Sequence, residues 1–306
     1  MARRETRPLI IVTDAASLGD DAVAIAMLVR ARRFDIKLVV ATSGNVWADQ
    51  VALNARNLLA QLHREDIRVC VGTPSSAFQD RWTALHLSAT ASSELHYVGA
   101  FAREIPTEAE EGRCRDLFEF IAAADRPDLL IIGPSSPIAC IVRMHRKLAE
   151  NVGRVFLMGG AVACDGNVTS AAEFNFWFDP EAAETLLASD LPITLLPLDA
   201  IRTLHYSAEF AAGLDPAHPV TKYIQNTVGN PRSLTACDEA LAAVMLDASV
   251  TCERRMLKLS VETKPGPGYG AVNVLDENAG RRPVEVITGI TESAFWHLAH
   301  RTLLEG

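Results

Sequence analysis

The stretch Leu-Ile-Ile-Val-Thr-Asp at residues 9–14, followed by Gly-Asp-Asp-Ala-Val-Ala-Ile-Ala-Met-Leu at residues 19–28, decides how the rest of this sequence is interpreted. The first segment is a short apolar run rich in Ile and Val, which is typical of a strand covered on both faces. The second segment continues into Arg30, Arg32 and Arg33, and cations are favoured in the last turn of a helix. Together the two segments predict a buried strand, a short loop and a helix.

Three carboxylates, those of Asp14, Asp20 and Asp21, gather at the junction of this strand and helix. In open α/β sheets, ligands bind outside the carboxyl ends of the strands. Anions crowded there repel one another unless a cation joins them, and a hard divalent ion with oxygen ligands would do so. Because Asp is also favoured at strand ends and as a helix cap, these residues alone leave a metal site and purely structural roles equally open.

Strands and helices alternate along most of the chain. The expected strands cover residues 9–14, 36–42, 67–72, 129–132, 155–158, 193–199, 257–263 and 284–287. The expected helices begin near residue 22 and cover residues 48–63, 116–123, 138–148, 180–187, much of 200–246, and 292–304. This alternation predicts a single α/β domain over residues 1–306, with a mainly parallel, open twisted sheet flanked by helices. Residues 73–112 have weak periodicity, and we expect them to form an irregular, lid-like region.

Composition narrows the class of protein. A net charge of -9 argues against nucleic-acid binding, which requires a basic face. The six cysteines are scattered without a CxxC pair, which favours reduced thiols in a cytoplasmic protein over a disulfide framework or a zinc site. The first residues lack an apolar signal region, and no stretch reaches transmembrane length, so we expect a soluble, cytoplasmic protein without a membrane partner.

Two further segments carry polar groups suited to a binding site. Residues 166–175 read GNVTSAAEFN. Asn167, Glu173 and Asn175 could grip a polyhydroxylated ligand, because amides donate and accept hydrogen bonds and a carboxylate accepts them. An ordinary loop before a helix has the same composition and is the favoured interpretation of this segment taken alone. Asp238 lies in an apolar helical pattern, where an acid is costly unless it is paired or binds a ligand; a partly exposed helix position is the alternative.

Several short motifs follow one another along the chain. They are Asp14 with Gly19-Asp20-Asp21-Ala22, Ser43-Gly44-Asn45, Ile132-Gly133-Pro134, Met158-Gly159-Gly160, Gly166-Asn167, Ala172-Glu173-Phe174-Asn175, Asp179-Pro180-Glu181-Ala182-Ala183, Pro197-Leu198-Asp199 and Cys237-Asp238-Glu239-Ala240-Leu241-Ala242. In this order, the motifs resemble those of the inosine-uridine-type nucleoside hydrolases. The resemblance covers nearly the whole chain, and it implies a mainly parallel sheet with a Rossmann-like core.

The resemblance implies calcium-dependent hydrolysis of the N-glycosidic bond of ribonucleosides, giving ribose and a free base. An oxygen-only set of protein ligands suits a hard cation. By position, the ligands of Ca²⁺ would be Asp14, Asp21, Asp238 and the backbone carbonyl of Ile132. Asp14 would also take a proton from the attacking water. The substrate-binding residues would be Asp20, Asn45, Met158, Asn167, Glu173 and Asn175.

The sequence departs from the family pattern at a few positions. Val12 stands where the family usually has an Asp, and Leu18 stands where a longer loop variant often has an acid, which puts metal affinity in question. Cys237 replaces the His that can protonate the leaving base in many members, and in this the chain is similar to a cysteine-bearing subgroup. We assign Cys237 as a catalytic residue beside Asp14, because a thiol can donate a proton at neutral pH. A space-filling role, with water as the donor, is equally open. His86 and His96 are conceivable stand-ins for the family's histidine near the base.

Two other functions remain open. One is hydrolysis of another N-riboside, such as a modified nucleoside or a pyridine riboside. The other is a non-catalytic ribose- or nucleoside-binding protein, against which Asp14 argues, because binding alone needs no group that activates water. A phosphate-handling enzyme is disfavoured because the sequence has no glycine-rich phosphate cradle. The resemblance also implies a homodimer or a homotetramer.

Overall fold

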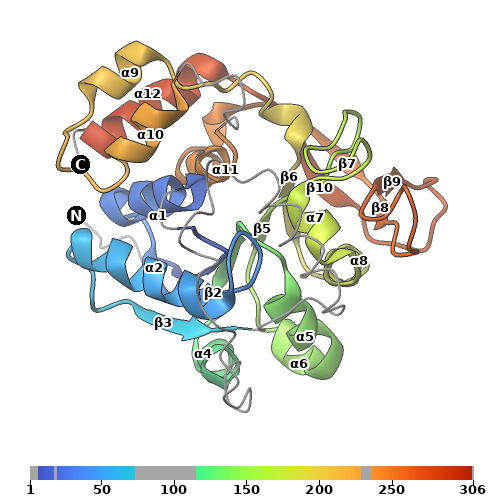
Figure 1. The fold of residues 1–306 in the computed structure, drawn as a ribbon. Helices are drawn as coiled ribbons and strands as arrows, with labels where there is room; N and C mark the ends of the chain where they lie inside the picture. The colour runs from blue at the N-terminus through green and yellow to red at the C-terminus, as the bar shows by residue number, and fades with distance from the viewer. Residues whose placement is uncertain (1–5, 17–18, 73–114, 229–235, 305–306) are drawn as a thin grey trace.

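The computed structural model describes residues 6–16, 19–72, 115–228 and 236–304, and an eight-stranded twisted sheet runs through them (Figure 1). In the order in which they lie side by side, its strands are β3 (Arg68–Val71), β2 (Asp35–Ala41), β1 (Pro8–Thr13), β4 (Asp128–Ile131), β5 (Val155–Met158), β6 (Ile193–Leu196), β10 (Val284–Ile290) and β7 (Thr251–Leu257). All neighbouring strands are parallel except β10 and β7. The predicted α/β class with a mainly parallel sheet is confirmed.

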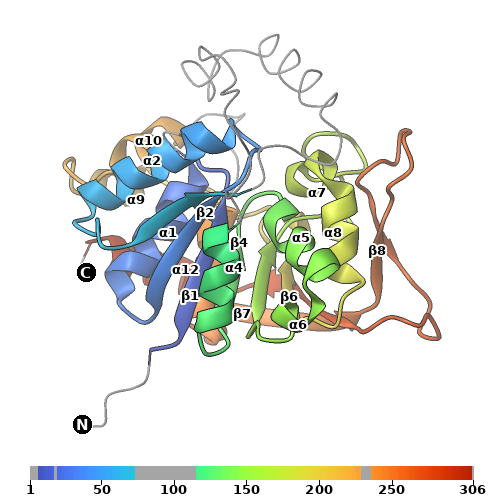
Figure 2. The ribbon, with the colours of Figure 1, turned by 90° about the horizontal axis from the view of Figure 1, so that it is seen from below.

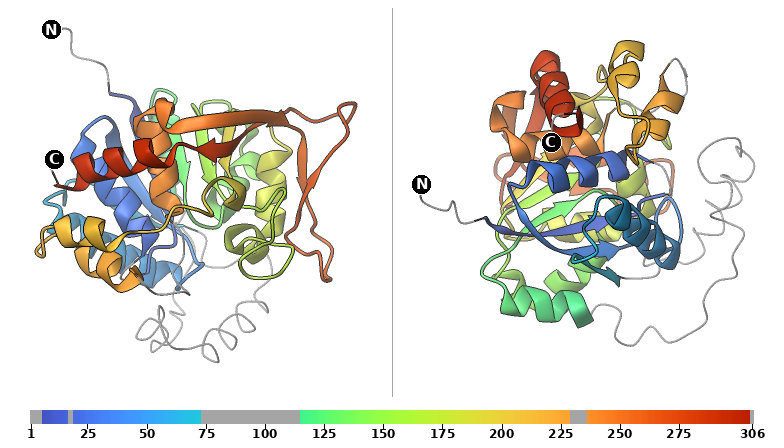
Figure 3. Two further views of the ribbon diagram at one scale, coloured as in Figure 1. Left: turned by 90° about the horizontal axis from the view of Figure 1, so that it is seen from above. Right: turned by 90° about the vertical axis from the view of Figure 1, so that its left-hand side faces the viewer.

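Helices cover both faces of this sheet, which gives three layers (Figures 2 and 3). On one face the core contains side chains of α1 (Asp20–Ala31), α2 (Ala48–Gln61), α9 (Ala208–Gly213), α10 (Thr221–Thr227), α11 (Asp238–Leu246) and α12 (Glu292–Leu304). On the other face it contains side chains of α4 (Arg115–Ala123), α5 (Ser136–Met144) and α8 (Pro180–Leu187). Shorter helical segments are α6 (Arg146–Ala149), α7 (Phe174–Phe178), η1 (Leu198–Ala200) and η2 (Ala248–Val250).

Strand β1 is apolar throughout because both of its faces are covered. Leu9 and Ile11 pack in the core that contains α1 and α11, whereas Ile10 and Val12 pack in the core that contains α5 and α8. All four side chains are 0% exposed. A strand at the centre of a three-layer structure therefore reads as one continuous hydrophobic run, without the alternation of a half-exposed strand.

The position of Val12 answers one question raised by the sequence. Its side chain packs with Val40 and Ile131 in the core beneath α5 and α8, and it does not face the group of acids beyond the end of β1. Val12 is therefore a core residue of this protein. Leu18, the second departure, lies outside the described residues.

Several elements differ from those expected. Helix α1 begins at Asp20 rather than at Ala22, and the helix predicted for residues 138–148 is interrupted at His145, which separates α5 from α6. The strand predicted for residues 257–263 is divided between β7 and β8 (Leu259–Val261). Strand β9 (Val272–Val274) lies in a segment expected to contain only turns. The region predicted to be lid-like, residues 73–112, lies outside the described residues.

Strands β8 and β9 form a separate antiparallel pair that projects from one side of the molecule (Figure 1). The loop between them returns to the body of the protein. Gly270 (φ +83°) lies against the backbone of Trp177, where a Cβ atom would come within 2.7 Å of the Trp177 Cα. The hydroxyl of Tyr269 donates to the carboxylate of Glu181 at 2.8 Å and 2.9 Å from its two oxygens. These contacts fix α7 and α8 against the pair.

Two expectations from composition can be compared with the structure. The cysteines of the described residues are all free thiols, at positions 70, 140, 164, 237 and 252. Within the same part of the chain, no helix has both the length and the apolar character needed to cross a membrane.

Candidate active site

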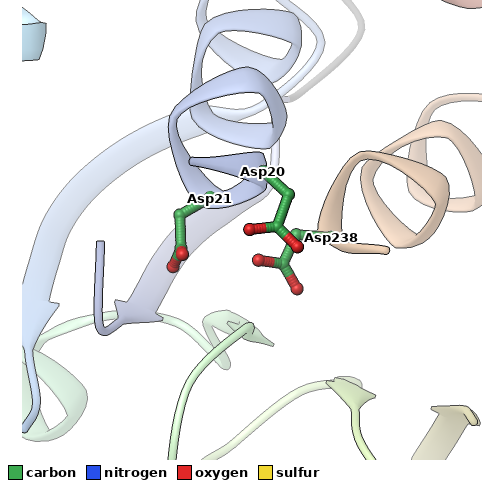
Figure 4. Close-up of side chains that lie close together, drawn as sticks. All are labelled: Asp20, Asp21 and Asp238. Atoms are coloured by element: carbon green, nitrogen blue, oxygen red, sulfur yellow. The ribbon is translucent and has the colours of Figure 1, made fainter. Parts of the chain in front are cut away.

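Three acidic side chains meet where the first turns of α1 and α11 come together. Asp20 and Asp21 begin α1, and Asp238 begins α11. One carboxylate oxygen of each residue lies within 4.8 Å of the others (Figure 4). The positive end of a helix dipole favours acids in the first turn, and here two such ends converge. The packing of α1 against α11 thus brings acids from the first helix and from the last third of the chain to one site.

Asp14 follows β1 directly and borders the same group of acids. Its Oδ2 accepts a hydrogen bond from the backbone N–H of Asn45 at 2.7 Å. A Cβ atom at Gly44 would lie 2.0 Å from Asp14 Oδ2, and one at Gly133 would lie 2.8 Å from Asp14 Oδ1. Because Gly44 and Gly133 have no side chain, the loops after β2 and β4 can pack directly against this carboxylate.

Thr13, the last residue of β1, orients Asp21. Its hydroxyl donates to Asp21 Oδ1 and accepts a hydrogen bond from the backbone N–H of Ala15 at 3.2 Å. Both side chains are almost fully buried. Asp21 is thereby held against the end of the strand.

A second group of polar side chains follows β5. The carboxylate of Glu173 caps α7 and accepts hydrogen bonds from three backbone N–H groups, those of Gly160 (2.8 Å), Asn175 (2.9 Å) and Phe176 (3.1 Å). The amide of Asn175 donates to the backbone oxygen of Met158 at 3.5 Å. The N-terminus of α7 therefore holds Glu173 rigidly.

Both groups line one cavity of about 170 Å³. Its described lining consists of Asp14, Asp20, Asp21, Asn45, Ile132, Met158, Asn167, Val168, Glu173, Phe174, Asn175, Cys237 and Asp238. The metal ligands, the substrate-binding residues and the two catalytic residues expected from the resemblance all line this cavity. The structure groups the acids differently in one respect, because Asp20 rather than Asp14 belongs to the three that lie within 4.8 Å.

Two lining residues, Val168 and Phe174, were not singled out from the sequence. The backbone N–H of Phe174 donates to Asn167 Oδ1 at 2.9 Å, and Val168 is 39% exposed. Each is an apolar residue adjacent to a predicted binding residue, Glu173 or Asn167. The signal that could have identified them is this position next to a predicted binding residue.

Burial changes the proton affinity of these acids. It raises the pKa of Asp14 to about 8, that of Glu173 to about 7 and that of Asp20 to about 6. Burial also raises the pKa values of Asp21 and Asp238 well above the ordinary value, and the neighbouring carboxylates add to the effect. Without a cation, the cluster therefore retains protons near neutral pH.

The donor set fits a hard divalent cation. Among the described residues that line the cavity there is no lysine, arginine or histidine to offset the acids. The groups offered by Asp20, Asp21 and Asp238 are all carboxylate oxygens, which Ca²⁺ and similar ions prefer. These three acids could hold a metal ion.

Other acids in the matching motifs have structural roles. The carboxylate of Asp199 accepts hydrogen bonds from the backbone N–H groups of Val162 (2.9 Å) and Ala163 (2.7 Å). Asp179 caps α8 and accepts a hydrogen bond from the Ser136 hydroxyl at 2.5 Å. His86 and His96 lie outside the described residues.

The sequence profile of the family described as inosine-uridine preferring nucleoside hydrolase matches residues 9–297. The chain belongs to this family. As a nucleoside hydrolase, it is a hydrolase acting on N-glycosyl compounds. That the chain belongs to a subgroup of this family with Cys237 in place of the usual histidine stays a prediction.

Individual relatives agree with this assignment. The pyrimidine-specific ribonucleoside hydrolase RihA of Escherichia coli O7:K1 is 29% identical over 232 residues, which cover 74% of this chain and 68% of RihA. Two solved structures share the fold. The plant nucleoside hydrolase PpNRh1 has a TM-score of 0.80 at 20% identity, covering 98% of this chain and 99% of its own. The purine-preferring ribonucleoside hydrolase of Gardnerella vaginalis has a TM-score of 0.78 at 19% identity, covering 98% and 100%.

Replacement of Gly44 by Ala should displace Asp14. The added methyl group would lie 2.0 Å from Asp14 Oδ2 and 2.7 Å from its Cγ, so this nucleoside hydrolase should lose on the order of 100-fold in kcat/KM. Gly280→Ala is the matched control, because no atom lies within 4 Å of a Cβ there. Steady-state kinetics of both variants would test this, and equal activities would contradict the proposed crowding.

The metal-free protein should become less stable as the pH rises. A raised pKa means that the folded protein binds a proton more tightly than the unfolded chain does. That contribution is complete below about pH 4 and is lost as the pH rises through about 8, the pKa of Asp14. Thermal unfolding with a chelator should show a falling Tm over this range, and Asp14→Asn should flatten the slope. A slope unaffected by this variant would contradict the assignment.

Proposed function

We propose that this protein hydrolyses the N-glycosidic bond of ribonucleosides in a calcium-dependent reaction that releases ribose and a free base. The observation that carries the proposal is the single cavity that unites the acid cluster with the Asn167–Asn175 segment. The names of its relatives support ribonucleosides as the substrate class. One relative is described as pyrimidine-specific and another as purine-preferring, so the base preference is left to experiment.

Asp14, Asp21, Asp238 and the backbone carbonyl of Ile132 would hold the ion, with Asp20 beside them. When bound, Ca²⁺ would supply positive charge that offsets the buried acids and lowers the pKa of the attacking water. The protein supplies the geometry for this reaction. Thr13 holds Asp21, and the N–H of Asn45 holds Asp14.

Asp14 is the proposed general base. Its carboxylate lines the cavity and is fixed by a hydrogen bond to one oxygen. A base of this kind accepts a proton from water as the water attacks the anomeric carbon of the ribose.

The ribose would be held by Asp20, Asn45, Met158, Asn167, Glu173 and Asn175. Breaking an N-glycosidic bond places positive charge on the sugar ring in the transition state. Carboxylates already fixed around the ring stabilise that charge more than they stabilise the neutral substrate. The three N–H groups that hold Glu173 support this role because they prevent its carboxylate from moving away.

Cys237 is the proposed proton donor to the leaving base. It lines the cavity at the N-terminus of α11, beside Asp238, and is 4% exposed. A neutral thiol can donate a proton at neutral pH. A water molecule in the cavity is the alternative donor.

We extend the proposal to the whole chain. Residues 1–306 form one nucleoside hydrolase-like domain, which is supported by one sheet that contains both β1 (Pro8–Thr13) and β10 (Val284–Ile290). The protein acts in the cytoplasm as a homodimer or homotetramer, without a nucleic-acid or membrane partner.

Hydrolysis of inosine, adenosine, guanosine, uridine and cytidine, followed by ribose release, tests the reaction. We expect turnover that a chelator abolishes and Ca²⁺ restores. Asp14→Asn should fold normally yet lose roughly 100-fold or more in kcat, because general base catalysis contributes about that much. Chelator-resistant turnover would overturn the calcium requirement. If only a modified nucleoside or a pyridine riboside is cleaved, the substrate class is wrong.

Cys237→Ala should reveal how the base departs. If the thiol protonates the leaving group, the variant should lose about 100-fold or more on natural nucleosides and much less on p-nitrophenyl riboside, whose leaving group needs no proton. Equal losses on both substrates would show that Cys237 is not the acid.

A further inference from the structure

A buried acid lies next to the cavity without lining it. Glu239 directly follows Asp238 and is 1% exposed. Its Oε1 accepts a hydrogen bond from the hydroxyl of Tyr206. Its Oε2 is buried and has no hydrogen-bond partner among the described residues. An acid buried with a single side-chain partner is costly, so this position requires an explanation.

Tyr206 belongs to a rigid aromatic group. Its ring centroid lies 5.6 Å from that of Phe210 and 5.2 Å from that of Trp296 on α12. Phe210 and Trp296 are themselves 5.3 Å apart. Tyr206 is 8% exposed, and such packing gives its hydroxyl a fixed position.

The segment from Leu204 to Tyr206 contacts the start of α11 at a second point. The backbone N–H of Ala236 donates to the backbone oxygen of Leu204 at 2.8 Å. The segment from Leu204 to Tyr206 is therefore attached on both sides of Cys237 and Asp238, through Ala236 before them and Glu239 after them. Both enclosed residues line the cavity.

The first turn of α11 must be placed accurately, because Asp238 meets Asp20 and Asp21 from another helix there. A small shift of this turn would move one carboxylate of the cluster away from the other two. We propose that Tyr206 and Glu239 are positioning residues, whose hydrogen bond holds the first turn of α11 so that Asp238 completes the acid cluster and Cys237 faces the cavity. The expected effects on calcium and turnover rest on the proposed function.

A second Tyr–Glu pair, with a buried tyrosine and a partly buried glutamate, provides the control. The hydroxyl of Tyr269 donates to the carboxylate of Glu181, on α8. Tyr269 is 6% exposed, and neither residue lines the cavity. Tyr206→Phe and Tyr269→Phe therefore each remove the hydroxyl of a buried tyrosine that donates to a glutamate, but only the first pair adjoins the cluster.

The experiment compares these two variants with the wild type by Ca²⁺ titration calorimetry, hydrogen exchange of the peptide that contains residues 236–246, and kcat/KM. Tyr206→Phe should raise the Kd for Ca²⁺ about tenfold, accelerate amide exchange at the start of α11 and lower kcat/KM. Tyr269→Phe should lower the Tm comparably and leave the Kd and this exchange unchanged. Unchanged exchange or unchanged Kd in folded Tyr206→Phe would overturn the inference.

Two variants of Glu239 test the same hydrogen bond if Tyr206→Phe does not fold. Glu239→Gln retains an oxygen acceptor for Tyr206, so exchange and the Kd should stay within about twofold of the wild type. Glu239→Met removes the acceptor and should reproduce the effects of Tyr206→Phe. Equal behaviour of the two would overturn the role of the hydrogen bond. A wild type that neither binds Ca²⁺ nor cleaves a ribonucleoside would instead refute the proposed function, while the exchange measurement would still decide whether the pair holds α11.

Discussion

Mutual repulsion among buried carboxylates is the constraint on which this structure depends. Asp21, Asp238 and Glu173 are each at most 4% exposed around one small cavity. The protein offsets part of their charge with its backbone, through two helix N-termini and the N–H groups that bind Asp14 and Glu173. Among the described lining residues, no cationic side chain offsets the remaining charge. In the proposed function, this charge would favour a bound cation and a sugar that becomes positively charged in the transition state.

The sheet order explains why these groups meet. Strand β1 lies between β2 and β4, at the point where the order of connections changes direction, and ligand sites of parallel sheets form at such points. Asp14 and Ile132 directly follow β1 and β4, and Asn45 lies in the loop that follows β2, so the segments after three adjacent strands meet at one edge of the sheet. Helix α11 then adds Asp238 from the far end of the chain by packing on α1.

Much of the site could be predicted because its polar residues lie in short local motifs. The carboxylates and amides that line the cavity each lie in a motif whose spacing was visible in the sequence.

What could not be predicted depends on contacts between distant segments. Because β1 is apolar on both faces, no pattern could show that Val12 points into the core, away from the acids. Asp238 was expected within a helix, because the apolar run after it hides the helix start. The bond between Tyr206 and Glu239 joins segments with no shared motif, and β9 is too short to be recognised among turn residues.

The meeting of Asp21 with Asp238 has a consequence for the whole polypeptide. A cation shared by these two residues would be a non-covalent cross-link between the first helix and the last third of the chain. Because these two residues come together only in the folded state, binding of the ion would stabilise the folded protein relative to the unfolded chain by mass action. The ion would therefore stabilise the tertiary structure in addition to its part in the reaction. Its loss would weaken the packing of α11 on α1.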